Sequence, residues 1–153
     1  MASYTFSRTG AEIEGILDHA ANQWTVIEGA TLTAEEWGHE KTDLSLSEVV
    51  VVISGFAPGT NGENVKLIVN GIECVQVWHN APQVNSYYHI RALPLSQGCY
   101  IEATGGSSQW KNFSPLYTGI VSDATDSRIT SVKIMPTSSS FPVGCTITMI
   151  GRA

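Results

Sequence analysis

The sequence is poor in basic residues and has no long apolar run. Lys and Arg number 8 in 153 residues against 14 Asp and Glu, which gives a formal net charge of -6 at pH 7. Binding to nucleic-acid phosphates needs clustered Lys and Arg, so the composition argues against a nucleic-acid partner. No stretch of about 20 apolar residues occurs, and we therefore expect no membrane partner.

The first residues lack the basic and then apolar build of a secretory signal peptide. We therefore expect the protein to be made and folded in a cytosol. The cysteines form no Cys-x-x-Cys pair, and each lies in an apolar, strand-like setting: Cys74, Cys99 and Cys145. That setting favours reduced, buried side chains over a disulfide or a metal site.

Signatures of catalysis and of metal or cofactor binding are also missing. No serine lies in a Gly-x-Ser-x-Gly elbow. Gly105 and Gly106 are expected in a flexible loop, because neither a Lys-Ser/Thr pair nor a helix start follows them as in a phosphate cradle. The histidines show no His-Glu-x-x-His or other metal-ligand spacing: His19, His39, His79 and His89. We expect no catalytic residue, no metal and no cofactor.

One pair of acids keeps an enzymatic alternative open. Two carboxylates in a cleft can hydrolyse a glycosidic bond, and Asp123 and Asp126 are the nearest pair, in one Ser- and Asp-containing loop. Asp and Ser in such loops more often form side-chain turns with the backbone. A small polysaccharide-degrading enzyme is therefore the least favoured of the functions that we consider.

The sequence does contain many short strand patterns separated by Gly and Pro. Val49 to Ile53 is an unbroken β-branched run, which favours a strand buried on both faces. Further strands are expected at 24–27, 86–92, 98–103 and 117–121. At 153 residues one domain is expected, and the pattern predicts an all-β fold over 23–153: an antiparallel β-sandwich, jelly-roll-like.

The segment 65–77 predicts a β-hairpin. Asn70 and Gly71 stand between two apolar runs, and a two-residue type I′ turn needs positive φ at both positions. The register that follows pairs Val69 with Ile72 and Leu67 with Cys74. It places the Cys74 side chain on the inner face.

Residues 1–22 are expected to form an arm and an oligomerisation helix. Thr9 to Glu12 fits a Thr-x-x-Glu capping box. An apolar stripe follows at helical spacing: Ile13, Ile16, Leu17 and Ala20. A helix of about three turns is too short to be stable alone, so it must pack on its own sandwich or on the same helix of other subunits.

An aromatic stretch suggests a second function, a carbohydrate-binding module. Exposed rings beside amides can stack on the apolar face of a sugar and bind its hydroxyls. The candidate glycan-binding residues flank 80–85, with one more in a later loop: Trp78, His79, Tyr87, His89 and Trp110. In the more usual arrangement Trp78 and Tyr88 lie in the core, and only Tyr87, His89 and Arg91 face outward.

The C-terminal stretch 128–152 has near-alternating apolar residues. Ile129, Val132 and Ile134 precede a polar loop, and Ile147 and Met149 follow it. This period of two predicts two half-buried strands joined across that loop. We expect the last strand to lie in the interior of a sheet.

Two terminal segments resemble bacteriophage fibre and tail-associated proteins. Residues 9–17, Thr-Gly-Ala-Glu-Ile-Glu-Gly-Ile-Leu, are similar to their Thr-Gly-x-Glu-Ile-Asp-x-x-Leu opening. Residues 141–151 are similar to their closing Phe-x-x-Gly-Ser/Thr-x-Ile-x-Leu-Tyr-Gly, with Cys145 in place of Ser or Thr and Ile150 in place of Tyr. The two matches cover about 20 residues of the chain, and the middle has no match.

The resemblance implies a non-enzymatic structural protein of a phage virion. Its expected partners are two further copies in a homotrimer, other virion proteins and a host surface glycan. Its expected role is that of a head or tail fibre, a decoration protein or a receptor-binding module, assembled in the cytoplasm of a bacterial host. A short helix with one apolar stripe is what a subunit needs to pack around a three-fold axis.

Overall fold

Ten short segments form β-strands in the computed structural model, which describes residues 23–56, 62–79, 85–95, 99–107, 118–122 and 128–153. No helix occurs within these residues, so the described chain is all-β, as predicted. The strands are β1 (Thr25–Thr31), β2 (His39–Lys41), β3 (Glu48–Ser54), β4 (Glu63–Val69), β5 (Ile72–His79), β6 (Ser86–Pro94), β7 (Cys99–Ser107), β8 (Thr118–Ser122), β9 (Val132–Pro136) and β10 (Thr146–Arg152).

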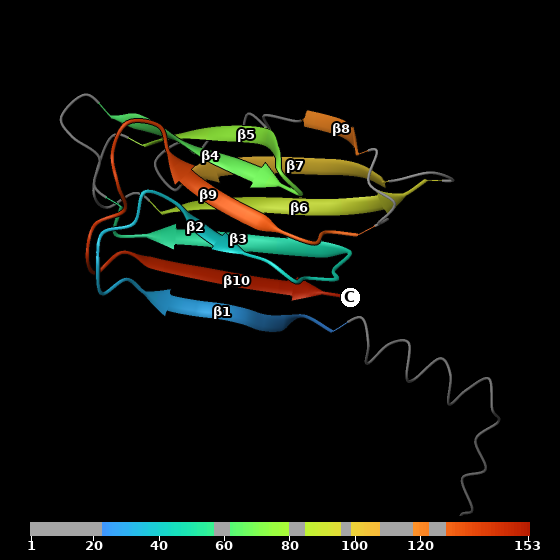
Figure 1. Ribbon diagram of the computed structural model, residues 1–153, viewed down its shortest axis with the longest axis horizontal. Helices are drawn as coiled ribbons and strands as arrows, with labels where there is room; N and C mark the ends of the chain where they lie inside the picture. The colour runs from blue at the N-terminus through green and yellow to red at the C-terminus, as the bar shows by residue number, and fades with distance from the viewer. Residues whose placement is uncertain (1–22, 57–61, 80–84, 96–98, 108–117, 123–127) are drawn as a thin grey trace, which may run out of the picture.

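The strands form two antiparallel sheets. The larger has six strands in the order β1-β10-β3-β6-β7-β8, and the smaller has four in the order β2-β9-β4-β5. In Figure 1 the strands β2, β9 and β4 of the smaller sheet cross in front of the larger sheet. Neighbouring strands of a sheet therefore come from distant parts of the chain, as where β10 lies between β1 and β3.

Both sheets bury one face in a common core. The inward side chains of β3, Val49, Val51 and Ile53, are fully buried, and so are Leu67 and other inward side chains of β4. The Tyr88 hydroxyl of β6 donates a hydrogen bond of 2.8 Å to the Val65 carbonyl of β4, which ties the two sheets together inside the core. All three cysteines are buried and free, as expected.

Two predictions for central strands have different outcomes. The prediction that β3 is buried on both faces is wrong, because Val50 and Val52 on its outer face are only half-buried. The interior position of the last strand is confirmed, since β10 pairs with β1 on one side and β3 on the other. Its partner across the polar loop, β9, lies in the other sheet.

The predicted hairpin turn is confirmed, and its register is confirmed in part. Asn70 and Gly71 have φ of 51° and 81°, the positive values that the turn requires. Val69 pairs with Ile72 as expected, but a register shift follows and Leu67 pairs with Val75 instead of Cys74. The extra residue leaves both Cys74 and Val75 buried, so the inward position of Cys74 still holds.

Several predicted features lie elsewhere or outside the described residues. Gly105 and Gly106 belong to β7, so their prediction as a loop is wrong. The helix with its stripe at Ile13, Ile16, Leu17 and Ala20 lies outside the described residues, as do Trp110, Asp123 and Asp126. Among the described residues, no helix has the length and apolar character to cross a membrane.

Candidate functional site

The aromatic residues that we expected to form one glycan platform do not share a surface. Trp78 lies on the outer face of the four-stranded sheet and is 44% exposed. Tyr87 and His89 face outward from β6, in the six-stranded sheet, while His79 is fully buried. The prediction that these residues form a single surface is therefore wrong. The core arrangement holds for the buried Tyr88 but not for Trp78.

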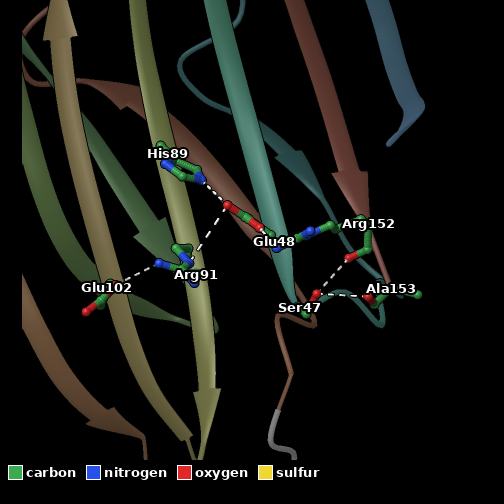
Figure 2. Close-up of polar contacts among 7 residues, drawn as sticks. All are labelled: Ser47, Glu48, His89, Arg91, Glu102, Arg152 and Ala153. Carbon is green, nitrogen blue, oxygen red and sulfur yellow. Dashed lines mark hydrogen bonds and ion pairs between the residues drawn. The ribbon is translucent and has the colours of Figure 1, made fainter. Parts of the chain in front are cut away.

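The structure instead brings together a row of alternating charges on the outer face of the six-stranded sheet. Arg152 of β10 pairs with Glu48 of β3, Glu48 with Arg91 of β6, and Arg91 with Glu102 of β7. Figure 2 shows this row together with His89. We name the group, with the indole beside it, the Trp24–Glu48 cluster: Trp24, Glu48, His89, Arg91, Glu102 and Arg152.

Glu48 is the centre of the cluster. Its side chain is only 8% exposed, and Arg152 Nη2 lies 2.5 Å from Oε2. The other oxygen, Oε1, is the partner of His89 Nε2 and lies 3.9 Å from Arg91 Nε. A buried carboxylate is strongly destabilising unless it is paired, so these three bases hold the charge of Glu48 in place.

Trp24 extends the cluster toward the start of β1. The Arg152 guanidinium carbon lies 5.7 Å from the centroid of the indole ring, within the range of a cation–π contact. The His89 ring centroid is 6.5 Å away and tilted by 49°. The indole is 42% exposed, so the contacts to Arg152 and His89 fix its position while part of the ring faces solvent.

Backbone packing brings Arg152 to Glu48. Ser47 donates from its amide to the Arg152 carbonyl at 2.9 Å. Its hydroxyl donates to the Arg152 carbonyl at 3.3 Å and to the Ala153 carbonyl at 2.9 Å (Figure 2). A Cβ on Gly151 would lie 2.7 Å from Ile27 Cδ1 and 3.0 Å from the Glu48 carbonyl. Glycine there lets β10 fit closely between β1 and β3.

A serine and a histidine also meet, but in the core. His79 Nε2 lies 2.8 Å from Ser86 Oγ, and both residues are fully buried. Burial lowers the pKa of His79 to about 4, although the nearby Glu63 carboxylate acts in the opposite direction. The imidazole is therefore neutral at pH 7. A hydroxyl beside a neutral base could act as a nucleophile, but no substrate reaches a pair without solvent access.

Glu63 itself organises the polar loop between β9 and β10. Its Oε2 accepts hydrogen bonds from the Ser138 amide at 2.8 Å and the Ser139 amide at 3.2 Å. Burial alone would raise the pKa of Glu63, but hydrogen bonds from the two serines outweigh it and lower that pKa overall. The carboxylate is therefore ionised at neutral pH and serves as a structural anchor.

His39 connects the two sheets at their edges. Its Nδ1 lies 2.7 Å from Glu36 Oε2, and its Nε2 lies 3.0 Å from Glu28 Oε2 of β1. Burial would lower the pKa of His39, but the bonds to both glutamates raise it overall. The carboxylates lie at opposite ring nitrogens, so they do not converge on one metal. No cluster of three or more metal ligands occurs among the described residues.

No model of a known protein family matches this chain, and no curated protein matches it. The Trp24–Glu48 cluster offers an aromatic ring, an imidazole, guanidinium donors and carboxylate acceptors on an open sheet face. Such a set can bind and orient a polar ligand without any covalent chemistry.

Proposed function

We propose that this chain is a non-enzymatic structural protein of a bacteriophage virion. It acts as a head or tail fibre, a decoration protein or a receptor-binding module. In this proposal the fold is a jelly-roll sandwich preceded by a helix over Ile13 to Ala20, and three copies associate through that helix. The assembled trimer joins other virion proteins in the host cytoplasm and can present its sandwich to a host surface glycan.

The strand order is the observation that carries this proposal. Four strand pairs are nested along the chain, β1 with β10, β2 with β9, β3 with β6 and β4 with β5, and successive pairs alternate between the sheets. This arrangement supports a jelly roll, a fold common in viral capsid and lectin domains. Along the chain, β7 and β8 lie between β6 of the third pair and β9 of the second pair. In space they extend the larger sheet beyond β6.

The residues of the C-terminal motif support the resemblance to phage proteins. Phe141 is fully buried and packs edge-on against Phe56, with ring centroids 5.2 Å apart. Gly144 has φ of 85°, a value that disfavours other residues, and Gly151 has no room for a Cβ. Cys145, where the phage motif has Ser or Thr, is fully buried. These positions fit a motif that specifies how the sandwich closes.

The mass of the protein in solution tests the trimer. We expect native mass spectrometry of the full chain at micromolar concentration to give three copies, because a single apolar stripe must be covered. Ile16→Glu should reduce the mass to one copy, while Glu14→Gln, off the stripe, should leave the trimer intact. A monomeric wild-type chain would contradict the proposal.

Localisation tests the virion assignment. An antibody raised against the chain should label assembled particles in electron micrographs of lysates from phage-infected cells that produce the protein. Label that stays with free protein, and never with particles, would argue against a virion component.

A further inference from the structure

We propose that the Trp24–Glu48 cluster is a binding site for a neutral saccharide. This inference deepens the proposed function, because it names the surface and the chemical class by which a receptor-binding module would recognise its partner. It depends on that function only for its biological role. The geometry that carries it is the fixed indole, the row of donors and acceptors beside it and the balance of their charges.

The indole of Trp24 supplies the apolar part of the site. One face of a pyranose ring is made of C–H groups, and an aromatic ring that is partly exposed can stack against it. Trp24 is held by the Arg152 guanidinium at 5.7 Å and the His89 ring at 6.5 Å. Because these neighbours hold the ring, little side-chain freedom is lost when a ligand binds.

The charged row supplies the polar part. Arg91 is half-exposed, and its ion pairs to Glu48 and Glu102 are both long, 3.9 Å. A guanidinium has five N–H donors, which these two long contacts do not saturate. Glu102 presents carboxylate oxygens from the next strand, with its side chain 27% exposed. Donors beside acceptors match a sugar hydroxyl, which both donates and accepts.

The cluster is also rigid in the way that a recognition site needs. Its charged residues and His89 come from four neighbouring strands, Trp24 directly precedes β1, and Glu48 pairs with both Arg152 and His89. Side chains that are locked by buried partners on a sheet hold their geometry better than side chains on loops. The row therefore presents a preformed surface.

Charge favours a neutral saccharide over an acidic one. Within the row, Arg91 and Arg152 balance Glu48 and Glu102. The whole chain carries a formal charge of -6, which repels acidic polymers at long range. Uronic-acid or sialic-acid polymers and nucleic acids would need a surplus of basic residues, which this site does not have.

The other outer face provides a matched control. Trp78 is exposed to a similar extent, 44% against 42% for Trp24, but it lies on the four-stranded sheet. Its ring covers Gly62, where an added Cβ would lie 2.7 Å from Cζ2. Trp24→Ala and Trp78→Ala therefore remove the same side chain from opposite faces of the molecule.

A glycan array probed with the full chain tests the inference. The array carries neutral oligosaccharides of glucose, galactose, mannose and N-acetylglucosamine, together with uronic-acid and sialic-acid oligosaccharides. We expect binding to at least one neutral oligosaccharide, weakened about tenfold or more by Trp24→Ala and several-fold by Arg91→Ala. Trp78→Ala should bind as the wild type does, and Trp24→Phe should retain part of the affinity.

Four outcomes would overturn the inference: no binding to any neutral oligosaccharide, binding to acidic ones alone, full binding by Trp24→Ala, or a loss specific to Trp78→Ala. Near-ultraviolet circular dichroism of each variant separates lost binding from lost folding. The mass of each variant is measured in parallel. A trimer without saccharide binding would contradict this site and leave the proposed function standing. A monomer that binds saccharide would support this site and contradict the proposed trimer.

Discussion

Burial of His79 couples the stability of the protein to acid. Its folded pKa of about 4 lies below the ordinary value of 6.5, so the unfolded chain binds the proton more tightly. The stability from the neutral ring is present above about pH 6.5 and is lost as pH falls toward 4. We expect the free energy of unfolding from urea titrations to fall by about 2 kcal/mol between pH 7 and pH 5.

His79→Gln tests the origin of this acid sensitivity. Glutamine can still hydrogen-bond to Ser86, but it does not titrate, so most of the decrease between pH 7 and pH 5 should disappear. Protonation of Glu63 adds its own loss at lower pH, because its folded pKa is also lowered. An unchanged pH dependence in His79→Gln would show that another group is responsible.

His39 should produce the opposite pH dependence. Its folded pKa is raised by Glu36 and Glu28, so its contribution is fully present below about pH 6.5 and is lost as pH rises through the folded pKa. A neutral imidazole has one N–H and can donate to only one carboxylate. In a His79→Gln background, which removes the opposing change from His79 above pH 6, urea titrations at pH 6 and pH 8.5 should show a loss of about 1 kcal/mol or less.

The charges around His39 define the variants for this measurement. Lys41 lies 4.0 Å from Glu28 and partly compensates that carboxylate, so Glu28→Gln should reduce the loss and His39→Gln should abolish it. All of these variants carry His79→Gln, because the titration of His79 between pH 6 and pH 7 would otherwise offset the loss. If the loss above neutral pH persists in His39→Gln, the contact between the sheets at this edge is not its source.

Among the elements, β7 contains two glycines because aromatic side chains lie against it. A Cβ on Gly105 would lie 2.5 Å from Val77 Cγ2 and 3.2 Å from Tyr88 Cδ1. On the outer face, a Cβ on Gly106 would lie 2.7 Å from the Tyr87 hydroxyl. Two adjacent glycines resemble a loop in sequence, but here they make room for rings on both faces of the strand.

Gly105→Ala should therefore destabilise the protein. The added methyl group must displace Val77 or Tyr88 in a packed core, at a cost of about 1–3 kcal/mol in unfolding free energy. Gly29→Ala in β1 is the matched control, because a Cβ there meets nothing within 4 Å. We expect that control to be neutral or stabilising by about 0.5 kcal/mol in urea titrations. Equal effects of the two changes would contradict this account of β7.

Local patterns predicted where the strands lie better than they predicted which residues pair across strands. Asn70 and Gly71 specify their turn through backbone conformation alone, and the period of two along β10 shows which side chains enter the core. The register shift between Leu67 and Ile68 has no such local signal, because it is a property of the pairing of β4 with β5.

The Trp24–Glu48 cluster could not be assembled from sequence for the same reason. Glu48, Arg91 and Arg152 are distant along the chain, and only the pairing of β10, β3 and β6 places them in one row. Period-two alternation puts Tyr87 and His89 on one outer face, but it does not say which strands lie beside them. Trp24 was predicted only as part of a short strand.

For the molecule as a whole, the cysteines report whether the two sheets separate. Cys74 comes from the smaller sheet, Cys99 from the larger, and Cys145 precedes β10; all are buried. Burial raises the pKa of the Cys74 and Cys145 thiols to about 11, so about one in a thousand would be ionised at pH 8. Only the thiolate reacts with a disulfide reagent, so the folded protein should resist labelling.

We expect the 3 thiols to react with Ellman's reagent at pH 8 at a single slow rate, and all of them at once in denaturant. Because the two sheets share one core, each thiol should become accessible only when the whole sandwich opens. That rate should equal the unfolding rate from circular dichroism, and Gly105→Ala should raise both rates together. If one thiol reacts early in the folded protein, its sheet opens independently, and the two sheets are not a single cooperative unit.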